Sequence, residues 1–156
     1  MSNLKRQFIP AAAIRQKVAA RRRSMNTTTR MSAFAHIVLP SDKNMYPEAY
    51  IDAFIASSIG PITIESILRF NALPATQALL RHAQRDLLRR IEVRAAQGQP
   101  IGLLSINDVS WVLGVSRSPV DHWRQKGLLA VQMVDEQCFV APSELVSRCS
   151  WVIPTR

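Results

Sequence analysis

Apolar residues recur at helical spacing along residues 75–97, and this is the longest regular pattern in the chain. The side chains that form its stripe are Leu80, Ala83, Leu87 and Ile91. Two shorter helices are predicted before it, over 47–58 and 63–71, with Pro47 in a first turn and Thr63 as an N-cap. Residues 42–98 are therefore expected to form a three-helix unit, either an assembly module or a second module that contacts DNA.

A second group of helices is predicted over residues 105–126, where two short helices are joined by a tight turn. Ser105 and Asp108 form a capping-box pattern, in which each side chain accepts a hydrogen bond from a backbone amide at the helix start. Gly114 supplies the left-handed residue that a sharp turn requires. Ser116 is then expected to cap the next helix.

The apolar and polar positions of this pair fit a helix-turn-helix. Two short helices that cross steeply need apolar residues facing each other, and a small residue at the crossing. The five core places are filled by Val109, Leu113, Val115, Val120 and Trp123, and the small place by Ser110. The outer face of the second helix is polar, with Arg117, Ser118, Asp121, His122 and Gln125. That face suits readout of the major groove, and a purely structural helical hairpin is the alternative interpretation.

The residues after Gly127 predict a hairpin and a last short helix. β-formers occupy 130–134 and 137–141, and Asp135-Glu136 makes the tight turn between them. A further helix is predicted to start at Pro142. Helix, turn, helix, hairpin and helix is the order of elements in a winged helix-turn-helix domain, which we place at residues 103–152.

The segment of about residues 103–149 resembles the excisionase and MerR-like winged helix-turn-helix domains. The matching residues are Leu113-Gly114-Val115-Ser116-Arg117-Ser118, Val120, Trp123, Lys126-Gly127-Leu128-Leu129 and Pro142-Ser143-Glu144-Leu145. The resemblance implies that the second helix enters the major groove and that the wing meets the neighbouring backbone or minor groove. By that resemblance, Ser116, Arg117, Ser118, Asp121, His122 and Gln125 face the groove.

Two positions depart from the pattern of these domains. The wing turn is acidic where glycine and arginine are common, so phosphate would repel Asp135-Glu136, and the wing is open to a protein contact instead. Pro119 stands where a polar residue is usual. The coiled coil that binds effectors in MerR proteins is not found in the sequence, which argues against a metal- or drug-sensing regulator.

Net charge changes the picture of the N-terminal part. The chain has 156 residues and a net charge of +9, from 20 Lys and Arg against 11 Asp and Glu. Eight of the basic residues and none of the acids lie in 1–41, which we predict to be a basic, flexible arm. Arg21, Arg22 and Arg23 would neutralise phosphates there, which gives affinity without sequence choice. An acid-free, arginine-rich start also fits a mitochondrial transit peptide.

The predicted fold class is therefore mainly α: a winged helix-turn-helix with a short β-hairpin, preceded by a small helical unit and a basic N-terminal arm. On the longest helix, Arg81, Arg85 and Arg89 form a ridge that either touches phosphates or is a solvated face. No apolar run is long enough for a transmembrane helix, so no membrane contact is expected.

Motifs for catalysis are not found in the sequence. Paired carboxylates in a recognisable frame, a glycine-rich phosphate loop and a Ser/His/Asp or Cys/His signature are all missing. The two cysteines and three histidines lack metal-ligand spacing. We therefore expect a protein that is not an enzyme and that needs no cofactor or metal.

Our main functional hypothesis is a sequence-specific protein that binds double-stranded DNA, either a transcriptional regulator or an accessory factor for recombination or partition of a mobile element. The helix 116–126 would read the major groove, with Arg124 and Lys126 beside the groove-facing residues. We expect a homo-oligomer located in the cytoplasm with the nucleoid.

Two other classes remain open. In an assembly protein, of the small-terminase or scaffold kind, the helices 47–97 and the winged domain or its wing would contact protein. An RNA-binding factor is the third class, and it is suggested by the arm alone.

Overall fold

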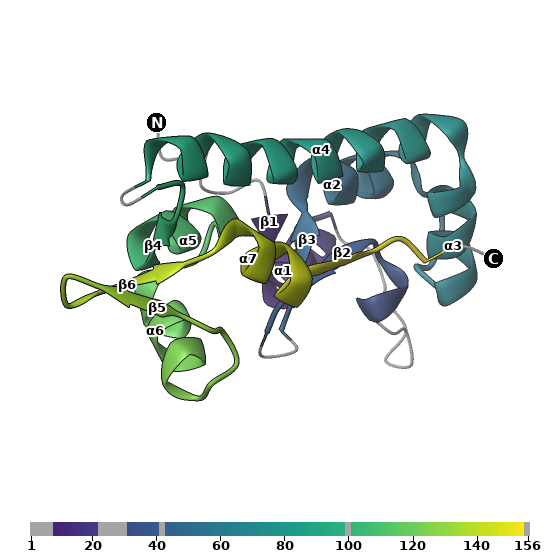
Figure 1. Ribbon diagram of the computed structural model, residues 1–156. Helices are drawn as coiled ribbons and strands as arrows, with labels where there is room; N and C mark the ends of the chain where they lie inside the picture. The colour runs from purple at the N-terminus through teal and green to yellow at the C-terminus, as the bar shows by residue number, and fades with distance from the viewer. Residues whose placement is uncertain (1–7, 22–30, 41–42, 99–100, 155–156) are drawn as a thin grey trace.

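The computed structural model describes residues 8–21, 31–40, 43–98 and 101–154. In this part of the chain the protein is mainly helical, with seven α-helices and two small antiparallel sheets, so the predicted fold class is confirmed at that level (Figure 1). Within the same residues, no helix combines the length and the apolar composition needed to cross a bilayer.

The N-terminal part is folded, where the sequence predicted a flexible arm. Helix α1 (Ala11–Ala20) buries Ile14 and Val18 completely or almost so. Its Lys17 ammonium lies 3.0 Å from the carboxylates of both Glu48 and Asp52. These hydrogen-bonded carboxylates raise the pKa of Lys17. The arm prediction for 1–41 is therefore wrong for residues 8–21 and 31–40, and the remainder of that range lies outside the described residues.

A four-stranded antiparallel sheet joins segments from both ends of the chain. Its strand order is β1 (Phe8–Ile9), β3 (Asn44–Pro47), β2 (His36–Val38) and β7 (Ser150–Val152). Ile37 of β2 pairs with Met45 on one side and with Trp151 on the other. The strands were not predicted, because runs of two to four residues show little alternation between the faces.

The three predicted central helices are present at nearly the predicted positions. They are α2 (Glu48–Ser57), α3 (Ile64–Ala72) and α4 (Pro74–Gln97). Thr63 caps α3 as expected, and the amide of Ser66 donates to its hydroxyl over 3.1 Å. Helix α4 is the longest element and runs along one side of the molecule (Figure 1).

The C-terminal part follows the predicted order of elements. It consists of β4 (Leu104–Ser105), α5 (Ile106–Leu113), α6 (Arg117–Gln125), the hairpin β5 (Gln132–Val134) and β6 (Gln137–Val140), and α7 (Pro142–Arg148). Strand β4 pairs with β6, so the hairpin belongs to a three-stranded sheet of order β4, β6, β5.

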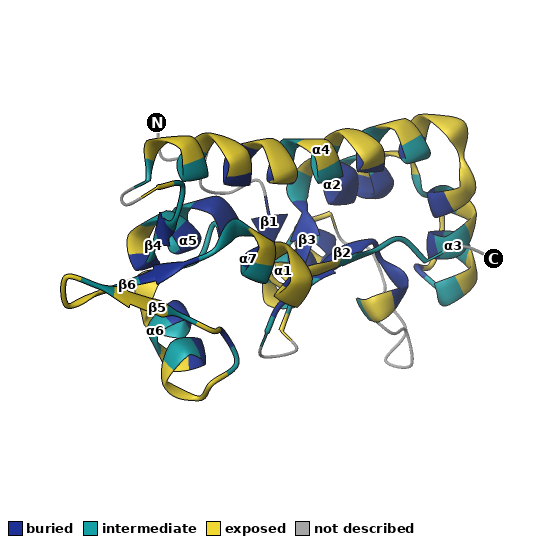
Figure 2. Cartoon of the chain, in the orientation of Figure 1, coloured by how far each residue is buried: buried dark blue, intermediate teal, exposed yellow. Residues whose placement is uncertain are grey.

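Two apolar clusters form the interior. One joins α5, α6 and α7 to α4, and the other joins α1, α2 and α3 to the four-stranded sheet. Trp151 packs against both clusters, and its ring meets Phe8 edge to face with centroids 6.0 Å apart. Buried positions therefore run through the whole described chain (Figure 2).

Buried polar groups connect the second cluster to the C-terminal segment. The hydroxyl of Tyr50 donates to the side-chain oxygen of Asn71, which is completely buried. The amide nitrogen of Asn71 donates to the carbonyls of Ala33 and Pro154, at 3.0 Å each. One asparagine thus holds three segments that are distant in sequence.

Candidate nucleic-acid interface

Helix α5 begins with the predicted capping box. The amide of Asp108 donates to the hydroxyl of Ser105, and the amide of Ser105 donates to the carboxylate of Asp108, over 3.1 Å each. Gly114 follows the helix with φ of 70°, in the left-handed region where a side chain is unfavourable. The amide of Val115 donates back to Ser110 over 3.1 Å and closes the turn.

The expected core places are filled as the pattern predicted. Val109, Leu113, Val120 and Trp123 are buried, and Val115 packs partly buried at the edge of the same cluster. Ser110 is half-buried, and its hydroxyl donates to the carbonyl of Asn107. Val112, which was not among the expected core residues, is also completely buried.

The outer face of α6 is exposed and polar. Ser118, His122 and Gln125 are exposed, and their spacing of four and three residues places them on one side of the helix. Val120 and Trp123 occupy the opposite side, against α5. Ser116 occupies the N-cap position as predicted, yet its hydroxyl makes no capping hydrogen bond and is exposed.

Beside this face, one carboxylate holds two arginines. Asp121 lies 3.3 Å from the Nε of Arg117 and 3.6 Å from a terminal nitrogen of Arg124. Arg117 also donates to the side-chain oxygen of Asn107 on α5 over 3.2 Å. Asp121, which was predicted on the outer face of the helix, is therefore only half-exposed.

This group lines a cavity of about 430 Å³ between the start of α5, the side of α6 and the hairpin. Arg117, Asp121 and Arg124 form one wall, and Glu136 and Cys138 of the hairpin contribute to another. Lys126, at the end of α6, is exposed and points away from this group by its position on the helix. Sequence reasoning missed Asn107, because only the tertiary contact between α5 and α6 identifies it.

The tip of the hairpin carries two acids in an unusual backbone conformation. Asp135 and Glu136 have φ of 50° and 67°, which is the geometry of a tight hairpin turn that normally favours glycine or asparagine. Both side chains are exposed. The wing is thus acidic at the point where it would approach a phosphate backbone.

Helix α4 supports α5 through two arginines that stack on one tryptophan. The guanidinium carbons of Arg90 and Arg94 lie 4.5 and 4.1 Å from the ring centroid of Trp111. Arg90 is buried, and it donates to the carbonyl of Trp111 over 3.0 Å. Burial lowers the pKa of Arg90. Trp111 is therefore a packing residue between α5 and α4.

Of the three arginines proposed for phosphate contact in the arm, the structure describes Arg21 alone. Arg21 is the exposed C-cap of α1, on a different element from α6. Arg22 and Arg23 lie outside the described residues.

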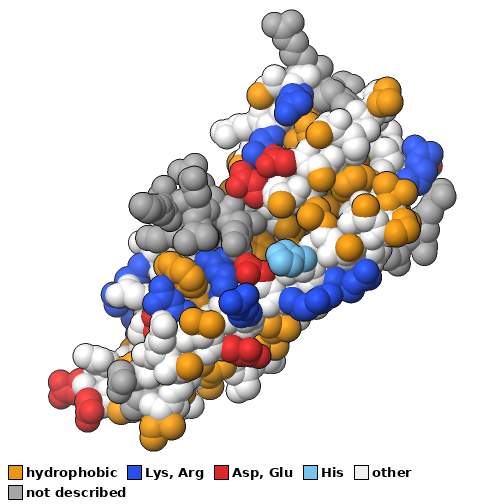
Figure 3. Space-filling view, turned by 90° about the horizontal axis from the view of Figure 1, so that it is seen from above, with side chains coloured by type: hydrophobic (Ala, Val, Ile, Leu, Met, Phe, Trp, Pro, Cys, Tyr) orange, Lys and Arg blue, Asp and Glu red, His pale blue; other side chains and the backbone are white. Residues whose placement is uncertain are grey.

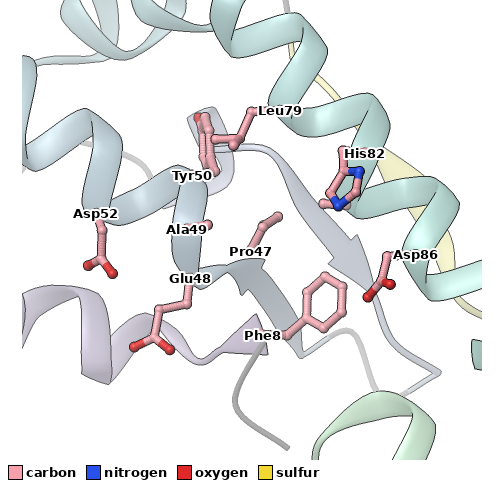
Figure 4. Close-up of a pocket in the computed structure, with 10 residues that line it drawn as sticks. Phe8, Pro47, Glu48, Ala49, Tyr50, Asp52, Leu79, His82 and Asp86 are labelled. Atoms are coloured by element: carbon pink, nitrogen blue, oxygen red, sulfur yellow. The ribbon is translucent and has the colours of Figure 1, made fainter. Parts of the chain in front are cut away.

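A second cavity, of about 410 Å³, lies between α2, α4 and the start of β1 (Figure 4). Phe8, Tyr50 and Leu79 give it apolar walls, and His82 and Asp86 reach it from α4. Among the residues that the structure describes, there is no cluster of three or more His, Cys, Asp or Glu that could hold a metal ion.

No protein-family model, no curated protein and no solved structure matches the chain.

Proposed function

We propose that the chain is a sequence-specific DNA-binding protein, and that residues 103–152 act as a winged helix-turn-helix. The observation that carries the proposal is the division of α6 into two sides. Val120 and Trp123 fix the helix on α5, and Ser118, His122 and Gln125 stand exposed on the other side. A rigidly supported helix with a free polar face can enter the major groove, where hydroxyl and amide groups discriminate base edges.

Electrostatics supports the same helix. Arg117, Arg124 and Lys126 give α6 three positive charges against one negative charge from Asp121. The arginines flank the polar face, where guanidinium groups would bind the phosphates beside the groove. Because an exposed ion pair contributes only about 0.2–1 kcal/mol, phosphates can compete with Asp121 for both arginines.

The acidic wing gives the proposal a specific form. Asp135 and Glu136 would be repelled by phosphates at the tip of the hairpin. We therefore assign the base contacts to α6 alone, and leave the wing tip turned away from the duplex or in contact with another protein.

The test is selection of bound sequences from a random pool of duplexes, followed by comparison of variants. Ser118→Ala with Gln125→Ala should reduce the preference for the selected site over random DNA by about 1–3 kcal/mol per lost base contact. Fluorescence anisotropy with both duplexes measures that preference. Ser147→Ala with Gln97→Ala removes the same exposed side-chain types from α7 and α4, and serves as the matched control.

Two results would contradict the proposal. One is a selection that enriches no sequence. The other is a preference that falls equally in the α6 variant and in its control. A large oligomer without affinity for DNA would favour the assembly function instead, with protein contacts made by the helices 47–97 and the winged domain.

A further inference from the structure

A row of three arginines covers the outer side of α4. Arg81, Arg85 and Arg89 are exposed, whereas Leu80 and Leu87 on the other side of the helix are buried. Figure 3 looks down on this face and shows Lys and Arg side chains gathered along it. We call these three residues the arginine ridge.

The ridge arginines differ from the other arginines of the same helix. Arg90 and Arg94 are held by Trp111, as described above. Within the described residues, by contrast, none of the three ridge arginines forms an ion pair. Three unneutralised guanidinium groups on one face repel each other mildly, and a polyanion would relieve that repulsion.

The spacing of the ridge suits a nucleic-acid backbone. Residues four apart rise by about 6 Å along a helix, so the ridge is about 12 Å long. One strand of a duplex carries a phosphate for roughly every 3.4 Å of its axis, so the ridge can lie beside three or four phosphates. Arg81, Arg85 and Arg89 do not line either of the cavities described above. A phosphate backbone can bind to such a surface without a cavity. A peptide that inserts a side chain would need one.

The ridge lies on the opposite side of the molecule from the reading helix. Helix α5 packs against α4 on one side and against α6 on the other (Figure 1). Two such helix spacings of roughly 8–10 Å each separate α4 from α6. Because the ridge faces away from α5, a duplex bound to α6 cannot also reach the ridge.

We propose that the arginine ridge binds the phosphate backbone of a second duplex, so that one molecule bridges two DNA segments. This inference rests on the proposed function, because α6 must hold the first duplex. The second contact is independent of sequence, as it involves phosphates alone. Its weak intrinsic affinity is raised when both duplexes belong to one long DNA molecule.

The experiment is a bridging assay with the full chain. A selected duplex is immobilised, the protein is added at about 50 mM salt, and retention of a fluorescent random duplex is measured. Arg81→Gln, Arg85→Gln and Arg89→Gln are combined in one ridge variant. Arg15→Gln, Lys43→Gln and Arg69→Gln remove the same charge from exposed positions elsewhere and form the control variant.

The ridge variant should bind the immobilised duplex as the parent does and lose retention of the second duplex. For the second duplex, the slope of log affinity against log salt should become shallower by about 2–3. Each lost phosphate contact accounts for roughly 0.9 of that change. The control variant should retain both steps. Light scattering should give the same molecular mass for all three proteins.

Several results would overturn the inference. Bridging by the ridge variant at the parent level would do so, as would an equal loss in the control. A ridge variant that also changes its oligomeric state would place the second α6, and not the ridge, on the second duplex. Capture of fluorescent poly-glutamate in preference to DNA would assign the ridge to an acidic protein.

Failure of the proposed function gives a different result. In that case Ser118→Ala with Gln125→Ala leaves binding of the immobilised duplex unchanged. The ridge variant then tests whether the ridge binds DNA without α6.

Discussion

Asp121 is the one acidic residue of α6. Its carboxylate holds Arg117 and Arg124, and Arg117 is also bound to Asn107 of the neighbouring helix. Both arginines thus have an acidic partner on their own helix. The same carboxylate places a negative charge beside the phosphates that those arginines would bind.

Asp121→Asn should therefore raise the affinity for DNA of any sequence. Removing one negative charge at roughly 6 Å from a phosphate is worth about 0.7 kcal/mol in water, or about threefold in affinity. Anisotropy titrations with random duplexes at several salt concentrations would measure both the affinity and its salt dependence. Glu65→Gln, an equal change of charge at an exposed position of α3, should have no such effect. Weaker binding by Asp121→Asn to every sequence would mean that orienting the arginines matters more than the repulsion.

For single residues of α6, the sequence predicted which side chains are exposed but not which groups they contact. Ser116, Arg117, Ser118, His122 and Gln125 are exposed, as helical spacing from the core residues requires. Their contact with DNA stays a prediction. The bond between Arg117 and Asn107 could not be predicted, because it depends on how closely α5 and α6 approach.

Among the elements, α4 ends at a glycine that lies directly against the residue before β4. Gly98 ends α4 with φ of −74°, an ordinary value for any residue. A Cβ atom at this position would nevertheless collide with the backbone carbonyl of Leu103. The glycine is therefore required for space and not for backbone conformation.

Gly98→Ala should destabilise the protein by about 2–3 kcal/mol, because the backbone must shift to accept the methyl group. Gly127→Ala is the comparison, since Gly127 has φ of 74° but open space around it. Its cost should be about 1 kcal/mol, from backbone strain alone. Urea unfolding of both variants measures the difference. Equal losses would show that the connection can relax around the methyl group.

Elements were predictable where a pattern extends over several turns. Helices α2, α3 and α4 were predicted in this way. The order of elements from α5 to α7 was also predicted, from the core positions, the turn residues and the cap residues. Helix α1 was mistaken for part of an arm, because its two buried residues stand among alanines and basic residues. Nothing local reveals that β1 and β3 cover that helix, since their pairing joins distant parts of the chain.

For the whole molecule, the structure differs most from the sequence prediction in where the excess positive charge lies. Eight basic residues in 1–41 suggested a flexible arm. Lys17 instead forms ion pairs with Glu48 and Asp52, and its helix is part of the second apolar cluster. The net charge of the chain is therefore a poorer guide to nucleic-acid binding than the sequence suggested, because some of its basic residues form ion pairs inside the fold.

Deleting residues 1–30 should unfold the protein or leave it without cooperative unfolding. The deletion removes four buried side chains, Phe8, Ile9, Ile14 and Val18. At about 1.5–3 kcal/mol each, their burial is comparable to the total stability of an ordinary domain. Near-ultraviolet circular dichroism and thermal unfolding measure the loss. A folded deletion variant would contradict the packing described for α1.

Charge at the same end must therefore be tested by substitution. Arg21→Gln, Arg22→Gln and Arg23→Gln leave the buried residues in place. If these arginines contact phosphates, the salt dependence of DNA binding becomes shallower by up to about 3 units in slope.

The pairing of β2 with β7 also means that the four-stranded sheet can form in full only late in synthesis. Ile37 leaves the ribosome early, and its partner Trp151 is added near the end of the described chain. Such long-range pairing slows folding, because a large loop must close before the contact forms. Until then, one edge of β2 has open backbone groups, and edges of this kind are sites of aggregation. A nascent chain that pauses before β7 would leave that edge open to pairing with other strands.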